Sequence, residues 1–187
     1  NAINVFKKFD DIELHIISPH LQLSDKIVEF VLEGIHYHLF RSEDDTFFFR
    51  FKRKCFGGKY FTYHYDNNSR TICSIVDGIN PDLVHLMGAE NPLYSSSLLK
   101  LNDKYPKLVT LQTLMNDPDF FKNYPISRPV YDYRASIEAS VIKSADFICS
   151  NVEHFRNLVW KYIDNSARFL DICLAIGEEI VLDPSEK

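Results

Sequence analysis

Short apolar runs separated by polar and turn-forming residues recur along the chain, and they predict β-strands. Residues 35–40 alternate in polarity, as a half-buried strand does. Residues 83–87 and 106–112 are nearly continuous apolar runs, which are typical of buried strands. The predicted strands cover residues 13–18, 35–40, 83–87, 106–112 and 145–150, with a last strand expected over residues 168–174.

Stretches with apolar residues at helical spacing lie between these runs and predict helices. The first helix is expected from Asp25, with Ser24 as its N-cap and Gly34 as its end. Residues 41–65 fit either a hairpin about Gly57-Gly58 or a helix with a loop, and both interpretations stay open. The other helices are expected over residues 70–77, ended by Gly78, over residues 93–103 and 130–143, and from residue 151 onward.

Strands that alternate with helices indicate a mostly parallel sheet, because parallel strands need crossover connections. Helices on both faces of such a sheet make a three-layer sandwich, so the expected fold class is α/β. The 187 residues fit a single domain spanning 1–187, and 45% of them are hydrophobic, which is enough for a substantial core.

The net charge and the cysteines indicate which partners and which cellular compartment the protein is expected to have. The net charge of −5 disfavours a nucleic-acid partner, which needs a basic surface. The 4 cysteines are far apart and none forms a CxxC pair, so we expect a reducing, cytoplasmic location. The basic residues within 50–54 are interpreted as a solvated edge; peripheral contact with the inner face of a membrane is the alternative.

The sequence gives little evidence for a metal-binding site, a cysteine nucleophile or a nucleotide-binding motif. His36 and His38 share one face of a predicted strand, which is a spacing compatible with a metal, but no third ligand is evident. We therefore predict no metal site. Cys55 has no visible base partner, and neither a Walker loop nor a GxGxxG motif occurs. We expect no cofactor in this chain.

Three segments, in order, carry a family resemblance: INPDLVHLMGAE (79–90), PKLVTLQ (106–112), and RASIE (134–138) followed by ADFICS (145–150). They resemble the strand–His–Gly–acid segment, the next strand, and the Glu-bearing helix with its Ala-Asp strand in retaining glycosyltransferases of family 4, also called group 1. The resemblance covers roughly residues 72–165.

The resemblance implies one half of a GT-B fold, in which two Rossmann-like domains face each other across a cleft. The chain resembles the N-terminal, acceptor-side domain without the family's first strand. The implied partners are a sugar or lipid-linked glycan acceptor and the C-terminal domain of the same chain. That C-terminal domain would hold the nucleotide-sugar donor, so the chain alone is expected to be inactive.

Ligands of open α/β sheets bind beyond the carboxyl ends of the strands. Together with the resemblance, this rule selects six acceptor-binding candidates, and no catalytic residue. Glu90 could accept hydrogen bonds from sugar hydroxyls, or be a charge at a helix N-terminus. The six candidates are Gly88, Glu90, Gln112, Thr113, Glu138 and Ser150.

Several of these residues also have a purely structural interpretation. Gln112 stands where many relatives carry a His, and it can bind a hydroxyl but cannot act as an acid or base. Arg134 lies four residues before Glu138, so an exposed ion pair is slightly favoured over a site role for Glu138. Ser150 is interpreted as a cap, and His85 as a hydrogen-bonded core residue.

Three functions remain open at this stage. The first is the acceptor-binding domain of a retaining glycosyltransferase. The second is a non-catalytic α/β regulatory or scaffold module, and the third is a different sheet enzyme of epimerase-like or flavodoxin-like type. Fold analogy alone licenses none of them.

Overall fold

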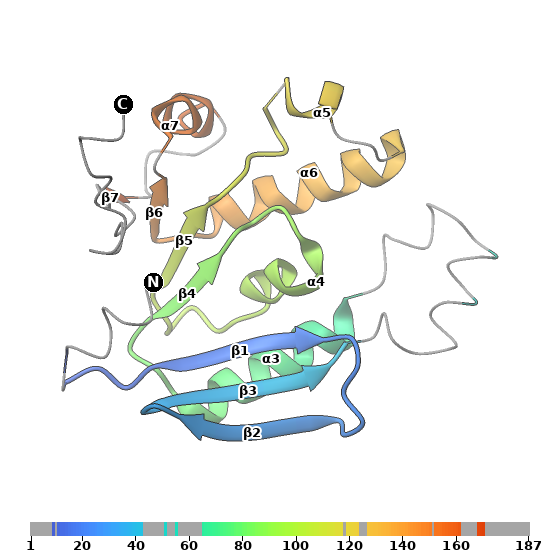
Figure 1. The fold of residues 1–187 in the computed structure, drawn as a ribbon. Helices are drawn as coiled ribbons and strands as arrows, with labels where there is room; N and C mark the ends of the chain where they lie inside the picture. Colours follow the sequence, from blue (N-terminus) through green and yellow to red (C-terminus); the bar gives the residue numbers. More distant parts are fainter. Residues whose placement is uncertain are drawn as a thin grey trace, which may run out of the picture.

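Two β-sheets and the helices packed on them make up the part of the chain that the structure describes (Figure 1). The computed structural model describes residues 9, 11–42, 51, 55, 65–117, 119–123, 127–150, 152–161 and 168–170. Within these residues one sheet has three strands in the order β1-β3-β2, and the other has four strands in the order β4-β5-β6-β7. Most of residues 41–65, for which a hairpin and a helix with a loop are both open interpretations, fall outside the described residues.

The three-stranded sheet combines parallel and antiparallel pairing. Strand β1 (His15–His20) runs parallel to β3 (Ile35–Arg41), and β2 (Ile27–Leu32) runs antiparallel to β3. Glu33 (φ 54°) and Gly34 (φ 80°) join β2 to β3, and two positive φ angles in a two-residue loop are typical of a type I′ hairpin turn.

The predicted helix from Asp25 is therefore wrong. Ile27, Val28, Phe30 and Val31 imitate a helical face, because apolar residues three and four positions apart also occur in an apolar strand. The β-branched side chains favour a strand, and pairing across the tight turn outweighs the helical spacing.

The four-stranded sheet is parallel throughout. It consists of β4 (Val84–Met87), β5 (Lys107–Leu111), β6 (Phe147–Ser150) and β7 (Arg168–Leu170). The predicted strands at 83–87, 106–112 and 145–150 are confirmed with slightly shorter bounds. Strand β5 is buried along its whole length, as a central strand with both faces covered should be.

Helices connect the strands and cover the sheets. Helix α3 (Asp66–Ile79) lies against the three-stranded sheet, and α6 (Arg128–Lys143) lies across the parallel sheet (Figure 1). The shorter helices are α5 (Phe120–Asn123) and α7 (Glu153–Val159). Helix α3 continues past Gly78 to Ile79, and Asn80, whose φ is 54°, is its left-handed C-cap.

The helix predicted over 93–103 is shorter than expected. Helix α4 (Pro92–Ser95) passes directly into a 3-10 helix, η3 (Ser96–Leu99). Ser96 Oγ donates to the carbonyl of Pro92 at 2.7 Å, and Ser97 Oγ donates to the carbonyl of Tyr94 at 2.6 Å. Hydroxyls that bond to the preceding turn compete with regular helix geometry, which explains the early end.

The larger of two hydrophobic clusters among the described residues joins the two sheets. Phe40 from β3, Val76 from α3, Val109 from β5 and Ile148 from β6 belong to one buried cluster. The chain is thus α/β with a four-stranded parallel sheet, as predicted. Its first three strands form a separate mixed sheet rather than extending the parallel one. Among the described residues, no helix is long and apolar enough to cross a membrane.

Candidate functional site at the carboxyl edge of the parallel sheet

The carboxyl ends of β4, β5 and β6 meet at one edge of the parallel sheet, so the segments that follow them are neighbours. Gly88 and Glu90 follow β4, Gln112 and Thr113 follow β5, and Ser150 ends β6. Five of the six predicted residues therefore lie at this edge. This is where open α/β sheets bind their ligands.

Gly88 shapes the turn that leaves β4. Its amide donates to the carbonyl of Thr110 at 2.9 Å, which extends the sheet by one hydrogen bond, and its φ is 86°. A Cβ atom at this position would lie 2.8 Å from Glu90 Oε2 and 2.9 Å from Glu90 Oε1. Glycine is therefore required both for the left-handed backbone and for the close approach of the Glu90 carboxylate.

Glu90 folds back over Gly88 and has one buried oxygen, Oε2, for which the described residues provide no hydrogen-bond partner. The carboxylate also affects the phenol of Tyr94. Burial of the ring is the main cause that raises the pKa of Tyr94 to about 12, and the negative charge of Glu90 is the second. A buried carboxylate oxygen without a donor is costly, so an unsatisfied atom here is the mark of a ligand or water position.

Thr113, just beyond β5, resembles Glu90 in having an unsatisfied buried oxygen. Its Oγ1 atom is buried and has no hydrogen-bond partner in the described part of the chain, and the same holds for Ser95 Oγ in α4, the helix after Glu90. Among the described residues these are the buried side-chain oxygens left unsatisfied, together with Glu90 Oε2. Two of the three belong to residues that the sequence selected.

Glu138 is fully buried, with 0% of its surface exposed, and its oxygens are satisfied. Oε1 accepts from the amide of Met115 at 2.9 Å, and Oε2 accepts from the amide of Asn116 at 3.0 Å and from Asn116 Nδ2 at 2.9 Å. Burial is the main cause that raises the pKa of Glu138, against the opposing effect of these bonds. The favoured interpretation as an exposed ion pair with Arg134 is wrong.

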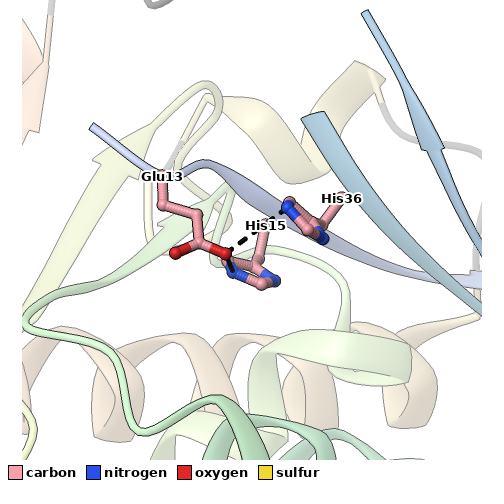
Figure 2. A group of neighbouring side chains, drawn as sticks. All are labelled: Glu13, His15 and His36. Carbon is pink, nitrogen blue, oxygen red and sulfur yellow. Dashed lines mark hydrogen bonds and ion pairs between the residues drawn. The ribbon is translucent and has the colours of Figure 1, made fainter. Parts of the chain in front are cut away.

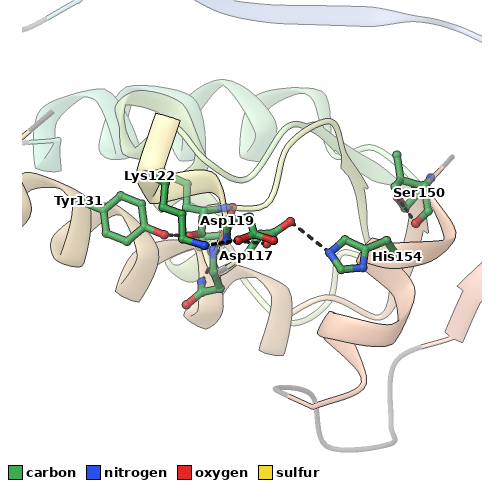
Figure 3. Close-up of polar contacts among 10 residues, drawn as sticks. Asp117, Asp119, Lys122, Tyr131, Ser150 and His154 are labelled. Carbon is green, nitrogen blue, oxygen red and sulfur yellow. Dashed lines mark hydrogen bonds and ion pairs between the residues drawn. The ribbon is translucent and has the colours of Figure 1, made fainter. Parts of the chain in front are cut away.

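The loop held by Glu138 contains two residues that sequence reasoning missed. Asn116 also donates through Nδ2 to the carbonyl of Ala135 at 2.9 Å, which fixes the loop to α6. Asp117 Oδ2 lies 3.2 Å from His154 Nε2, so the loop after β5 is joined to α7 (Figure 3). The only sequence signal was the polar turn Asp117-Pro118, which says nothing of a partner on α7.

Ser150 and Gln112 have different surroundings. Ser150 Oγ accepts from the amide of Val152 at 3.1 Å, in a turn just before α7 (Figure 3). This resembles the expected capping role, although Val152 occupies the N-cap position and Asn151 is outside the described residues. Gln112 is exposed at the strand end, where its amide can reach a ligand.

His85 lies within β4, away from the edge. Its Nε2 atom is 2.6 Å from Thr110 Oγ1, which is 2.7 Å from Cys149 Sγ, so a polar chain crosses three strands. The predicted hydrogen bond is present, but the residue remains exposed on the outer strand rather than buried in the core. Partial burial of the ring lowers the pKa of His85.

The edge therefore offers hydrogen-bond acceptors and hydroxyls held in fixed positions. The negative charge of Glu90 is a minor contribution to the raised pKa of Glu138, after burial. Such a set can bind the hydroxyl groups of a polar ligand. No protein-family model matches the chain, and no curated protein matches it either.

Proposed function

We propose that the carboxyl edge of the parallel sheet binds a sugar, and that the chain is the acceptor-side domain of a retaining glycosyltransferase of the GT-B type. The observation that carries the proposal is the pair of unsatisfied buried oxygens, Glu90 Oε2 and Thr113 Oγ1. A carboxylate oxygen is an acceptor and a threonine hydroxyl is both donor and acceptor, and a pair of sugar hydroxyls complements both.

The loop structure supports a binding role more than a catalytic one. The carboxylate of Glu138 already accepts hydrogen bonds from the amides of Met115 and Asn116, so it positions the loop after β5 instead of contacting a ligand. Gln112 cannot transfer protons near neutral pH, and it would add one exposed amide to the ligand contacts. The nucleotide-sugar donor would be held by a second domain, and the chemistry would take place between the two.

The proposal is tested by nuclear magnetic resonance on the ¹⁵N-labelled chain, titrated with methyl glycosides of glucose, galactose, mannose and N-acetylglucosamine. We expect at least one glycoside to shift the amides of residues 88–90 and 112–117. Glu90→Gln and Thr113→Val should each weaken that binding by about tenfold, the cost of one hydrogen bond left without its partner.

Glu153→Gln, on the exposed first turn of α7, is the matched control and should leave the titration unchanged. A parallel titration with UDP-glucose tests whether the nucleotide-sugar donor binds this chain or needs a second domain. Shifts at residues 88–90 with the nucleotide-sugar but with no simple glycoside would refute the acceptor-side assignment and favour a different sheet enzyme. No shift with any of these ligands would favour the non-catalytic module.

A further inference from the structure

Five ionisable side chains gather on one face of the three-stranded sheet, away from the edge described above. Parallel pairing sets His15 of β1 opposite His36 of β3, and strand alternation puts His38 on the same face as His36. Antiparallel pairing sets Glu29 of β2 opposite His38. Glu13, just before β1, completes the group. The sequence revealed only the pair His36 and His38, because the other three come from different strands.

Glu13, His15 and His36 converge on a common point (Figure 2). Glu13 Oε1 lies 3.1 Å from His15 Nε2 and 3.4 Å from His36 Nε2, and the three potential ligand atoms lie within 4.8 Å of one another. Metal–ligand bonds of about 2.0–2.1 Å place neighbouring ligand atoms about 3.3 Å apart in a tetrahedral zinc site. The two short distances match the edges of such a tetrahedron.

The remaining two residues form an outer layer behind His15. His15 Nδ1 lies 3.0 Å from His38 Nε2, and His38 Nδ1 lies 2.7 Å from Glu29 Oε1. Histidine ligands of metals commonly use the second ring nitrogen to bond a neighbouring polar group, and this bond fixes the ring and its tautomer. His15 has that arrangement here, with a carboxylate at the far end of the chain.

A count of hydrogen atoms shows why a cation belongs at the Glu13 end. The chain from Glu13 through His15 and His38 to Glu29 has three close contacts, and each needs one hydrogen between its two acceptors. Two neutral imidazoles carry two N–H groups. If His38 donates to Glu29 and His15 donates to His38, then the lone pair of His15 Nε2 faces the Glu13 carboxylate, and either an added proton or a metal ion must lie between them.

We propose that Glu13, His15 and His36 bind a divalent transition-metal ion, with Zn²⁺ as the expected ion. Two imidazoles and one carboxylate are the donor set of zinc sites that keep an open position. The side chains are 69%, 19% and 37% exposed respectively, so an ion can reach the site and a water or a further ligand can complete the tetrahedron. His38 and Glu29 are positioning residues that orient His15.

The first test is isothermal titration calorimetry of untagged, chelator-treated protein with ZnCl₂, since a polyhistidine tag would bind the ion itself. We expect one equivalent of Zn²⁺ to bind. His15→Ala and His36→Ala should each weaken binding by more than about 100-fold, and Glu29→Gln by about 10-fold, as loss of outer-layer partners does. His20→Ala is the matched control, because His20 ends the same strand and contacts the backbone of Gln22 instead.

A second measurement uses the unmodified protein, in case a variant does not fold. In long-range ¹⁵N–¹H spectra of the imidazole rings, one equivalent of Zn²⁺ should shift Nε2 of His15 and His36 and leave His20 and His154 unchanged. Unchanged His15 and His36 signals would overturn the proposal, since the extra cation would then be a proton. Zinc binding that persists undiminished in a His15→Ala/His36→Ala variant would overturn it equally.

Discussion

Two glutamates near the carboxyl edge of the parallel sheet have opposite surroundings. Glu138 is fully buried and accepts three hydrogen bonds from the loop after β5. Glu90, after β4, has a buried oxygen, Oε2, to which no described residue donates within hydrogen-bond distance. A buried carboxylate with all its partners stabilises the fold, whereas one that lacks a partner costs stability unless a ligand supplies it. The first therefore builds the site, and the second is available to a ligand.

The largest effect should come from Glu138→Ala. Removal of the carboxylate leaves the amides of Met115 and Asn116 buried without acceptors, so the free energy of unfolding should fall by about 3 kcal/mol. Urea denaturation measures this loss. Glu153→Ala on the exposed face of α7 is the control and should show no measurable change. An equal, small change in both variants would contradict the structural role of Glu138.

Gly88→Ala should have a smaller effect on stability, of about 1–2 kcal/mol, because φ at this position is 86° and a left-handed alanine is strained. The new methyl group would also displace the Glu90 carboxylate, 2.8 Å away. In a double-mutant cycle with Glu90→Ala, the contribution from this contact disappears and only the backbone strain remains. Strict additivity of the two changes would show that Glu90 does not lie over Gly88.

Thr113→Val should change stability in the opposite direction from Glu138→Ala. The substitution replaces an unsatisfied buried hydroxyl with a methyl group of similar shape, so we expect no loss and a gain of up to about 1 kcal/mol. Thermal or urea unfolding decides the sign. A clear loss would mean that Thr113 Oγ1 has a tightly held partner, such as an ordered water, and is part of the framework like Glu138.

The smallest expected effect is a change in the titration of Tyr94. In the folded protein its pKa is about 12, above the ordinary value of 10.0, because of burial and then Glu90. The protonated phenol is favoured by the fold, so this contribution to stability is present below pH 10 and is lost between about pH 10 and about pH 12. In Glu90→Gln the pKa of Tyr94 should fall, as measured by resonance of ¹³C-labelled tyrosine with Tyr94→Phe for assignment. An unchanged pKa of Tyr94 would show that the charge of Glu90 does not affect the phenol.

The sequence was most informative where hydrophobicity and local geometry agree. Residues 83–87, 106–112 and 145–150 are apolar runs bounded by turns, and each forms a strand of the parallel sheet. Gly88 and Glu90 were selected because they follow such a run. The helix expected from Asp25 failed because the spacing of Ile27, Val28 and Phe30 is compatible with both structures, and pairing with β3 decided between them.

Contacts between distant segments were beyond reach of the sequence. Nothing in the helix 130–143 indicates that Glu138 points inward to bind Met115 and Asn116, and the spacing from Arg134 suggested an ion pair instead. Similarly, His36 and His38 lacked a third ligand until β1 was known to pair parallel to β3, which brought Glu13 and His15 to them. Packing of α6 against the loop after β5 created the first group, and the register between β1 and β3 created the second.

The two-residue turn at Glu33 and Gly34 has a consequence for how the chain acquires its structure. Strands β2 and β3 are neighbours in sequence, so their hairpin can form within microseconds, before any long loop has closed. Strands β5 and β6 must instead meet across the helix α6, as the bond between the Lys107 amide and Asp146, 39 residues away, illustrates. Such non-local pairing is slower, so the hairpin that carries His36 and His38 should form while the carboxyl edge of the parallel sheet is still open chain.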